Sequence, residues 1–124
     1  GLLGVSGLSG DMRELLASED ARAREAVELF TFRIARETAA LANSLDGLEL
    51  LVFTGGIGEH AAPIRAMVAS RLRWLGVRLD PAANAEAAER IDAPQSAVEI
   101  RIIPADEELA IARHTAALAA EAGA

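Results

Sequence analysis

The sequence contains no cysteine and no lysine, and these two absences exclude several kinds of chemistry. Without cysteine, the chain has no disulfide framework, no thiolate zinc site and no cysteine nucleophile. Every basic side chain is an arginine, so a phosphate-binding loop of the Walker type, which needs a lysine that reaches the phosphates, is excluded. Schiff-base chemistry on this chain is excluded for the same reason.

Positive charge is scarce, and long apolar runs are missing. The 124 residues include 19 acidic and 12 basic side chains, which gives a formal net charge of −7 at pH 7. A nucleic-acid binder would need a basic face, and an anionic membrane surface would need a basic run. No apolar segment approaches the roughly 20 residues that span a bilayer, and no basic region typical of a signal peptide begins the sequence. We therefore expect a cytoplasmic protein without nucleic-acid or membrane partners.

The first part of the chain has the pattern of two helices. Hydrophobic residues make up 52% of the sequence, which is enough for a packed core. Asp11 is a suitable N-cap for a short helix through Leu16. A second helix is predicted to begin at residues 18–20 and to run to about Ser44. Its apolar residues recur at helical spacing and define one face, formed by Val27, Phe30, Ile34, Leu41 and Leu45.

The rest of the chain alternates strand and helix patterns. Residues 48–53 are short, apolar and partly β-branched, as in a parallel strand that is covered on both faces. A helix is predicted from Ala62 to a stop at Gly76, and we expect Trp74 and the three phenylalanines in the core. This order of helix, strand, glycine turn and helix predicts an α/β fold in one domain. The further predicted elements are a short strand at 77–79, a helix at 81–90, a strand at 98–103 and a final helix at 106–120.

The number of predicted strands is small for such a fold. Only two or three strands are predicted, and two of them have the composition of buried strands. A parallel strand that is buried on both faces needs neighbours at both edges. We therefore expect that the sequence is cut from a larger protein, whose N-terminal domain and first strands of this domain are absent here.

A glycine segment, TGGIGE at Thr54–Glu59, follows the first predicted strand. It lies at the carboxyl end of that strand, where open α/β sheets bind ligands. Glycine lets the backbone approach a ligand closely, and the N-terminus of a following helix attracts anions. The spacing is not that of the dinucleotide-binding fingerprint, and the same glycines would serve a simple turn. Both interpretations remain open on these residues alone.

Two further groups of residues allow a structural and a functional interpretation. Arg13 is suited to hydrogen-bond or stack on a planar ligand group, with Asp11 to orient it, but a helix cap plus a surface arginine explains the same pattern. Three consecutive acidic residues at 106–108 favour the dipole of a helix start. That structural account explains most acidic helix starts, and the functional alternative is a carboxylate near a hydrated Mg²⁺ ion.

In their order and spacing, these segments resemble the acetate kinase family. The resemblance covers nearly the whole chain, and VFTGGIGEH closely matches a signature of that family. It implies the actin-like, ribonuclease-H-like ATPase fold, with this chain as part of the C-terminal domain. The similar segments are GVSGLSGDMREL at 4–15, LFTFRIARETAAL at 29–41, VFTGGIGEH at 52–60, RLDPAANA at 78–85 and SAVEIRIIPADEELAIARHT at 96–115.

The resemblance implies phosphoryl transfer between ATP and acetate, which gives ADP and acetyl phosphate, with Mg²⁺ and in a homodimer. It implies a carboxylate near the metal at Glu107. His60 stands where the family commonly has asparagine, and Ala105 stands where it commonly has threonine, so a helix-capping pattern is lost there. The implied nucleotide-binding residues are Asp11, Met12, Arg13, Gly56, Ile57, Gly58, Glu59 and His60.

Acetate kinases are much longer than this chain, and the resemblance assigns no catalytic residue to it. Phosphoryl transfer depends on positioning and charge stabilisation of the transferred group. In the family, the residues that provide both lie upstream of the matched region. We therefore expect the isolated chain to be inactive. The alternatives are a piece of a propionate or butyrate kinase, or a fragment that acts as a nucleotide-binding or dimerisation module.

Overall fold

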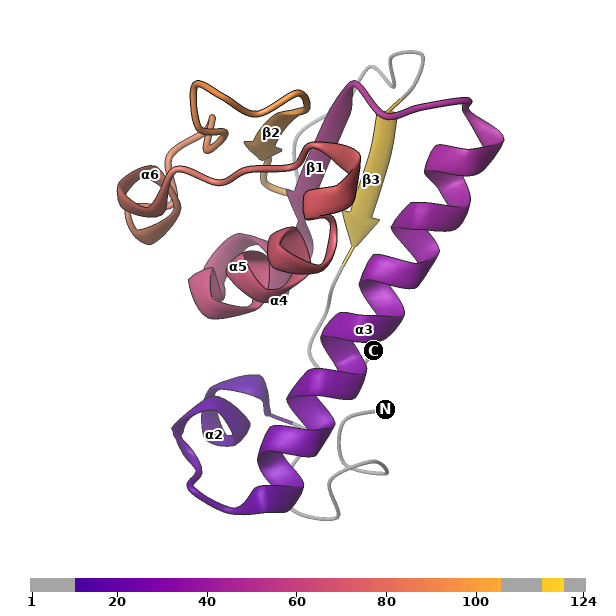
Figure 1. Cartoon of the computed structure of the whole chain (residues 1–124). Coiled ribbons are helices and arrows are strands. Elements are labelled where there is room, and N and C mark those ends of the chain that lie inside the picture. Colours follow the sequence, from indigo (N-terminus) through magenta and orange to yellow (C-terminus); the bar gives the residue numbers. More distant parts are fainter. Residues whose placement is uncertain (1–10, 106–114, 120–124) are drawn as a thin grey trace.

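The computed structural model describes residues 11–105 and 115–119 of the chain (Figure 1). The strands form one sheet in the order β2-β1-β3, and β1 is parallel to both neighbours. This arrangement confirms the predicted α/β class. The elements are α2 (Met12–Ala17), α3 (Ala21–Ser44), β1 (Leu50–Thr54), α4 (Gly55–His60), α5 (Ala62–Arg71), the 3-10 helix η1 (Arg73–Leu75), α6 (Pro81–Ala85), β2 (Glu99–Ile102) and β3 (Thr115–Ala119).

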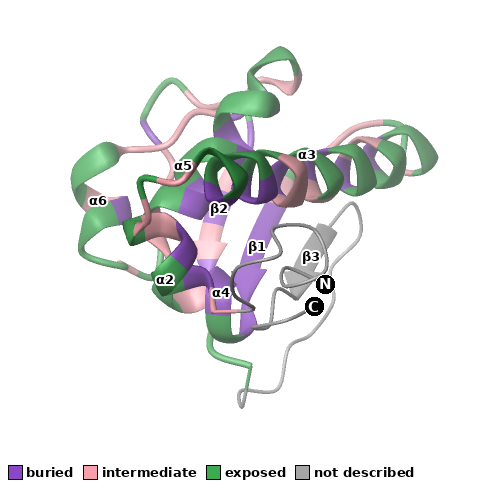
Figure 2. Ribbon diagram, turned by 90° about the horizontal axis from the view of Figure 1, so that it is seen from below, coloured by how far each residue is buried: buried purple, intermediate pink, exposed green. Residues whose placement is uncertain are grey.

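Strand β1 lies in the middle of the sheet and is buried on both faces. Leu51, Val52 and Phe53 are all buried (Figure 2). Because side chains alternate along a strand, Val52 points away from the face that the other two share. In the register of the sheet, Leu51 lies beside Ile100 and Phe53 beside Ile102 of β2. The predicted buried parallel strand is therefore confirmed, with bounds shifted by one or two residues.

Helices α3 and α5 pack against each other and cover one face of the sheet (Figures 1 and 2). The buried residues of α3 include several alanines, such as Ala23 and Ala26, whose small side chains let neighbouring elements approach closely. Of the residues predicted on its apolar face, Val27 is buried, whereas Leu41 is 43% exposed. None of the described helices is long and apolar enough to cross a membrane.

Most helix ends follow the predicted signals. The side chains of Asp11 and Asp20 cap α2 and α3. After α5, the chain tightens into η1 and stops at Gly76, whose φ of 88° is left-handed. A Cβ atom at Gly76 would lie 2.7 Å from the Cβ of Ala97, so both the backbone conformation and the space favour glycine there. The stop at Gly76 is confirmed, although the last turn before it is not α-helical.

Several sequence predictions are wrong. The predicted helix at 81–90 ends at Ala85, because the chain turns at Ala87 (φ 52°) and brings Ile91 alongside β2, where its N–H donates to the carbonyl of Ile100 at 2.8 Å. Residues 77–79 form no strand and contribute one isolated bridge at Leu79.

The final helix predicted at 106–120 is contradicted at residues 115–119. Residues 106–114 lie outside the described residues, but Thr115–Ala119 form β3 instead of a helix. Strand β3 pairs with β1 over its whole length. A buried parallel strand needs partners for its backbone groups at both edges, and this need overrides the helical preference of an alanine-rich segment.

Two aromatic residues that were expected in the core lie at the surface. Trp74 is 68% exposed and Phe32 is 45% exposed, whereas Phe53 is buried. The guanidinium groups of Arg36 and Arg71 lie over the ring of Phe32, at 5.8 and 5.7 Å from its centroid. Cation–π contacts of this kind allow an aromatic ring to remain at the surface.

Candidate functional site

The glycine segment forms helix α4 rather than an extended turn. Gly55 has a φ of 78°, so the chain changes direction within one residue after β1. Thr54 occupies the N-cap position but makes no side-chain cap hydrogen bond. Helix α4 therefore begins directly at the carboxyl end of β1, where the sequence places a ligand site.

A hollow of about 430 Å³ lies at the carboxyl ends of β1 and β2. Glu59 and His60, the last residues of α4, line one side of it. Ile103 and Pro104, which directly follow β2, line another, together with Glu89. The structure thus brings two predicted site residues together with a segment that is more than 40 residues away in the sequence. The carboxyl edge of a parallel sheet is the expected place for such a site.

Glu59 connects α4 to the segment that follows β2. Its Oε2 accepts a hydrogen bond from the backbone N–H of Ala105 at 3.2 Å. Gly56 is exposed, whereas Ile57 and Gly58 are buried. The side chain of Ile57 belongs to the hydrophobic core. Of the predicted residues of this segment, Gly56, Glu59 and His60 are accessible to a ligand, and Ile57 anchors the helix.

Asp11 both caps α2 and orients Arg13. Its Oδ1 accepts from the backbone N–H of Arg13 at 2.8 Å, and its Oδ2 lies 3.6 Å from the guanidinium. The backbone hydrogen bond is the main reason that the pKa of the Asp11 carboxyl lies below its ordinary value. The Arg13 side chain is 93% exposed. The geometry therefore fits both interpretations of this pair, because Asp11 caps α2 and also orients Arg13.

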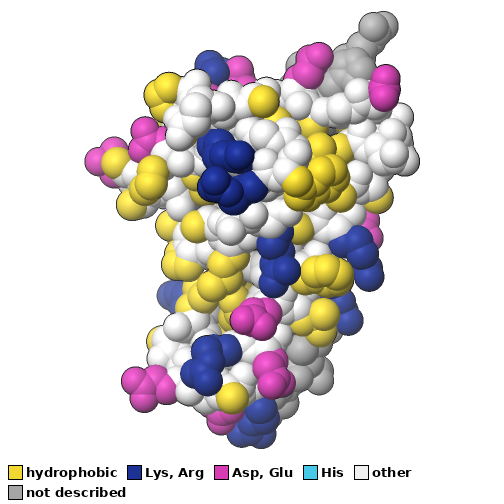
Figure 3. All heavy atoms as spheres, in the orientation of Figure 1, with side chains coloured by type: hydrophobic (Ala, Val, Ile, Leu, Met, Phe, Trp, Pro, Cys, Tyr) yellow, Lys and Arg dark blue, Asp and Glu magenta, His cyan; other side chains and the backbone are white. Residues whose placement is uncertain are grey.

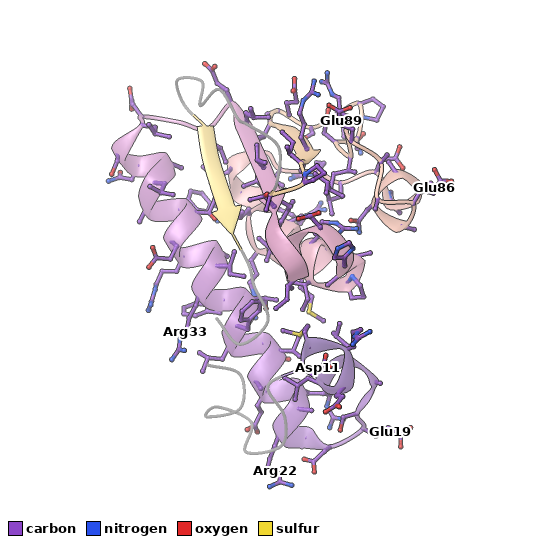
Figure 4. The ribbon with its side chains drawn as sticks, turned by 180° about the vertical axis from the view of Figure 1, so that it is seen from behind. Asp11, Glu19, Arg22, Arg33, Glu86 and Glu89 are labelled. Atoms are coloured by element: carbon purple, nitrogen blue, oxygen red, sulfur yellow. The ribbon has the colours of Figure 1, made fainter. Side chains whose placement is uncertain are left out.

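A second pair in the chain has the same local geometry. Asp20 caps α3, accepts from the backbone N–H of Arg22 at 2.8 Å and forms an ion pair with its guanidinium at 3.1 Å. Figure 4 shows Arg22 pointing outward from the end of α3, and Asp11 beside α2. Capping alone thus explains the local arrangement at Asp11. The geometry of that pair by itself does not indicate a ligand.

The other predicted site residues are placed as follows. Met12 is 3% exposed and belongs to the same hydrophobic core as Ile57, so it packs α2 against the rest of the domain. Arg13 does not line the hollow described above. Glu107 lies outside the described residues. Within residues 11–105 and 115–119, no group of three or more His, Cys, Asp or Glu side chains is placed to hold a metal ion.

The sequence analysis missed one buried residue beside the site, Arg65. It is 1% exposed and donates to the backbone carbonyls of Gly58 and Glu59 at the end of α4, each at 3.0 Å. The only sequence signal for its burial is its spacing, because it lies three residues before Val68 on the buried face of α5. An arginine is rarely buried, so composition argues against that placement.

Comparison with known proteins gives a consistent result. The model of the acetokinase family matches residues 1–113. An acetate kinase of Rhodopseudomonas palustris is 61% identical over 121 residues, which are 96% of this chain and 30% of that enzyme. A crystal structure of a propionate kinase from Francisella tularensis is similar with a TM-score of 0.77 and 39% identity, and covers 84% of this chain. The acetate kinase of Entamoeba histolytica is similar with a TM-score of 0.80 and 31% identity, over 86% of this chain and 30% of its own length.

The chain therefore belongs to the acetokinase family. The likeness to these solved kinases confirms the predicted fold class, including its place in the actin-like ATPase fold. The chain spans about 30% of the length of the curated relatives that it matches. The relatives named above are kinases, that is, phosphotransferases.

The buried hydroxyl of Thr54, at the junction of β1 and α4, leads to a prediction about stability. Within the described part of the chain, its Oγ1 is buried without a hydrogen-bond partner. An unsatisfied buried hydroxyl costs roughly 1–3 kcal/mol, so we predict that Thr54→Val raises the free energy of unfolding by about 1 kcal/mol. Urea denaturation measures this change.

A matched control is available in α3. Thr38 is buried as well, but its hydroxyl donates to the carbonyl of Ile34 at 2.8 Å. Thr38→Val removes a satisfied hydrogen bond and is expected to lower the free energy of unfolding by about 1 kcal/mol. Equal losses in both variants would show that the Thr54 hydroxyl has a partner in the folded protein.

Proposed function

We propose that this chain forms one wall of the nucleotide pocket of an acetate kinase. The observation that carries the proposal is the hollow between α4 and the end of β2, lined by Glu59, His60, Ile103 and Pro104. It lies at the carboxyl edge of a parallel sheet, and the segment that contributes Glu59 and His60 matches a family signature. The membership of the chain in the acetokinase family supports the same assignment.

In the proposed reaction, the whole enzyme transfers the γ-phosphoryl group of ATP to a carboxylate oxygen of acetate, and ADP leaves. Arg13, with Asp11 to orient it, and the accessible residues Gly56, Glu59 and His60 are proposed to contact the nucleotide. The other predicted residues, Met12, Ile57 and Gly58, are buried and are proposed to hold these contacts in place. A bound Mg²⁺ would neutralise phosphate charge during the transfer. The proposed ligand Glu107 lies outside the described residues, and residues 11–105 and 115–119 contain no group of three or more His, Cys, Asp or Glu side chains that could hold the ion.

The acceptor is proposed to be acetate, as in the R. palustris relative. The solved structure from F. tularensis is that of a propionate kinase, so propionate is the main alternative. No catalytic residue is proposed on this chain, and the isolated chain is expected to form no acetyl phosphate. A cytoplasmic location remains a prediction from the sequence.

Calorimetric titration of the chain with ADP and Mg²⁺ tests the pocket wall. We expect weak binding, because the chain supplies only part of the pocket. His60→Ala removes a side chain that lines the hollow and is expected to lower the affinity about fivefold, as the loss of one hydrogen bond predicts. Glu86→Ala is the control, because Glu86 points outward from the end of α6 (Figure 4) and does not line the hollow.

The same titration tests Arg13. Arg13→Ala is compared with Arg22→Ala, since both arginines follow a capping aspartate by two residues and both side chains are exposed. A specific contact predicts a loss of about tenfold for Arg13→Ala and no change for Arg22→Ala. Equal affinities of the two variants for ADP would show that Arg13 does not contact the nucleotide. An absence of ADP binding by the parent chain would contradict the proposed pocket wall.

A dimerisation module is the second candidate function. It is supported by the exposed hydrophobic side chains of Phe32, Met67 and Trp74 on α3, α5 and η1. Figure 3 shows hydrophobic and arginine side chains next to one another over these elements. Exposed apolar groups of this size are often covered by a partner, so we propose that this face contributes to a homodimer. Light scattering over a range of concentrations is expected to show dimers, and a monomer throughout would contradict this proposal.

A further inference from the structure

Arg65 is a buried cation that, within the described part of the chain, donates hydrogen bonds to neutral oxygens and forms no ion pair. Its Nε donates to Oδ1 of Asn84 at 2.7 Å and its Nη2 donates to the carbonyl of Asn84 at 2.8 Å. Its Nη1 donates to the carbonyls of Gly58 and Glu59. Burial lowers the pKa of this guanidinium below its ordinary value. Buried charges are usually paired with an opposite charge, and here backbone and amide dipoles take that place.

These contacts join three helices. The carbonyls of Gly58 and Glu59 belong to the last turn of α4, where backbone carbonyls have no partner inside the helix. A cation at this end is also favoured by the helix dipole. On the other side, the Nδ2 of Asn84 in α6 donates to the carbonyl of Ala62, at the start of α5, at 3.1 Å. Arg65 therefore fixes the end of α4 to α5 and α6.

The same turn of α4 carries the accessible residues of the candidate site. Glu59 is held twice, because its carbonyl accepts from Arg65 and its carboxylate accepts from the N–H of Ala105. His60 is the next residue, and both line the hollow. A displacement of this turn would move Glu59 and His60 together and would break the connection to Ala105.

We propose that Arg65 is a positioning residue, which holds the last turn of α4 so that Glu59, His60 and the segment at Pro104 and Ala105 form one ligand wall. Arg65 is buried and touches the backbone of α4, so it acts through that backbone and not on the ligand. The effect on ligand affinity rests on the nucleotide-binding function proposed above. The effect on the geometry of α4 does not.

The test compares two variants in the full 124-residue chain. Arg65→Lys keeps the charge, but a single ammonium group does not reproduce the planar fork that reaches both α4 and Asn84. Asn84→Ala removes the amide contacts and leaves the Arg65 contacts with Gly58 and Glu59 in place. Both variants lose buried hydrogen bonds, so both are expected to be less stable. Arg71→Lys is the matched control, because Arg71 lies on the exposed side of the same helix.

Hydrogen exchange and ADP titration give independent results. The N–H of Ala61 donates to the carbonyl of Ile57, and the N–H of Ala105 donates to Glu59, so both amides report on the end of α4. We expect the hydrogen-exchange rates of these two amides to be about tenfold higher in Arg65→Lys than in the parent chain. We also expect this variant to bind ADP about tenfold more weakly. Asn84→Ala and Arg71→Lys are expected to leave both quantities within about twofold of the parent.

Two outcomes would overturn the proposal. One is unchanged exchange at Ala61 and Ala105 in Arg65→Lys. The other is an equal loosening of these amides in Asn84→Ala, which would indicate a general loss of stability rather than positioning. If Arg65→Lys does not fold, Arg65→Gln takes its place with the same expected result, because its amide cannot donate to Gly58, Glu59 and Asn84 together. If the parent chain does not bind ADP, the proposed pocket wall fails, but the exchange rates still decide whether Arg65 positions α4.

Discussion

The pairing of β1 with a parallel neighbour on each side is the constraint on which the other features depend. Its central residues are buried on both faces, so their backbone N–H and C=O groups find partners only in adjacent strands. Strands β2 and β3 provide them in parallel register. A parallel neighbour requires a crossover connection, and the chain between β1 and β2 supplies it as α4, α5 and α6. Helix α4 must therefore start at the carboxyl end of β1, which is where the candidate site lies.

The site is stabilised by a small number of polar contacts that arise from this crossover. Arg65 and Asn84 connect the end of α4 to α6, and Glu59 connects it to the segment after β2. These contacts are made mainly with backbone atoms, so they fix the path of the chain around the hollow. They do not supply reactive groups to it. Phosphoryl transfer itself relies on positioning and charge stabilisation of the transferred group.

Local signals predicted the parts of the fold that depend on neighbouring residues. The cap at Asp11, the helix start at 18–20, the stop at Gly76 and the buried strand predicted at 48–53 are all recognisable from a few adjacent residues. Thr115–Ala119 were predicted as the last part of a helix, but pairing with β1 decides their conformation. The contacts of the site were not predictable, since Arg65 and Asn84 are 19 residues apart and Glu59 and Ala105 are 46 apart. Such pairs are set by tertiary packing.

The central proposal is that this chain forms one wall of the nucleotide pocket of an acetate kinase. A hybrid enzyme tests it directly: the matched segment of the R. palustris acetate kinase, 30% of that enzyme, is replaced by this 61% identical chain. Formation of acetyl phosphate from ATP and acetate is then measured. The account predicts turnover within about tenfold of the parent enzyme, which corresponds to a change of about 1.4 kcal/mol in the activation free energy. A hybrid that folds but forms no acetyl phosphate would contradict it.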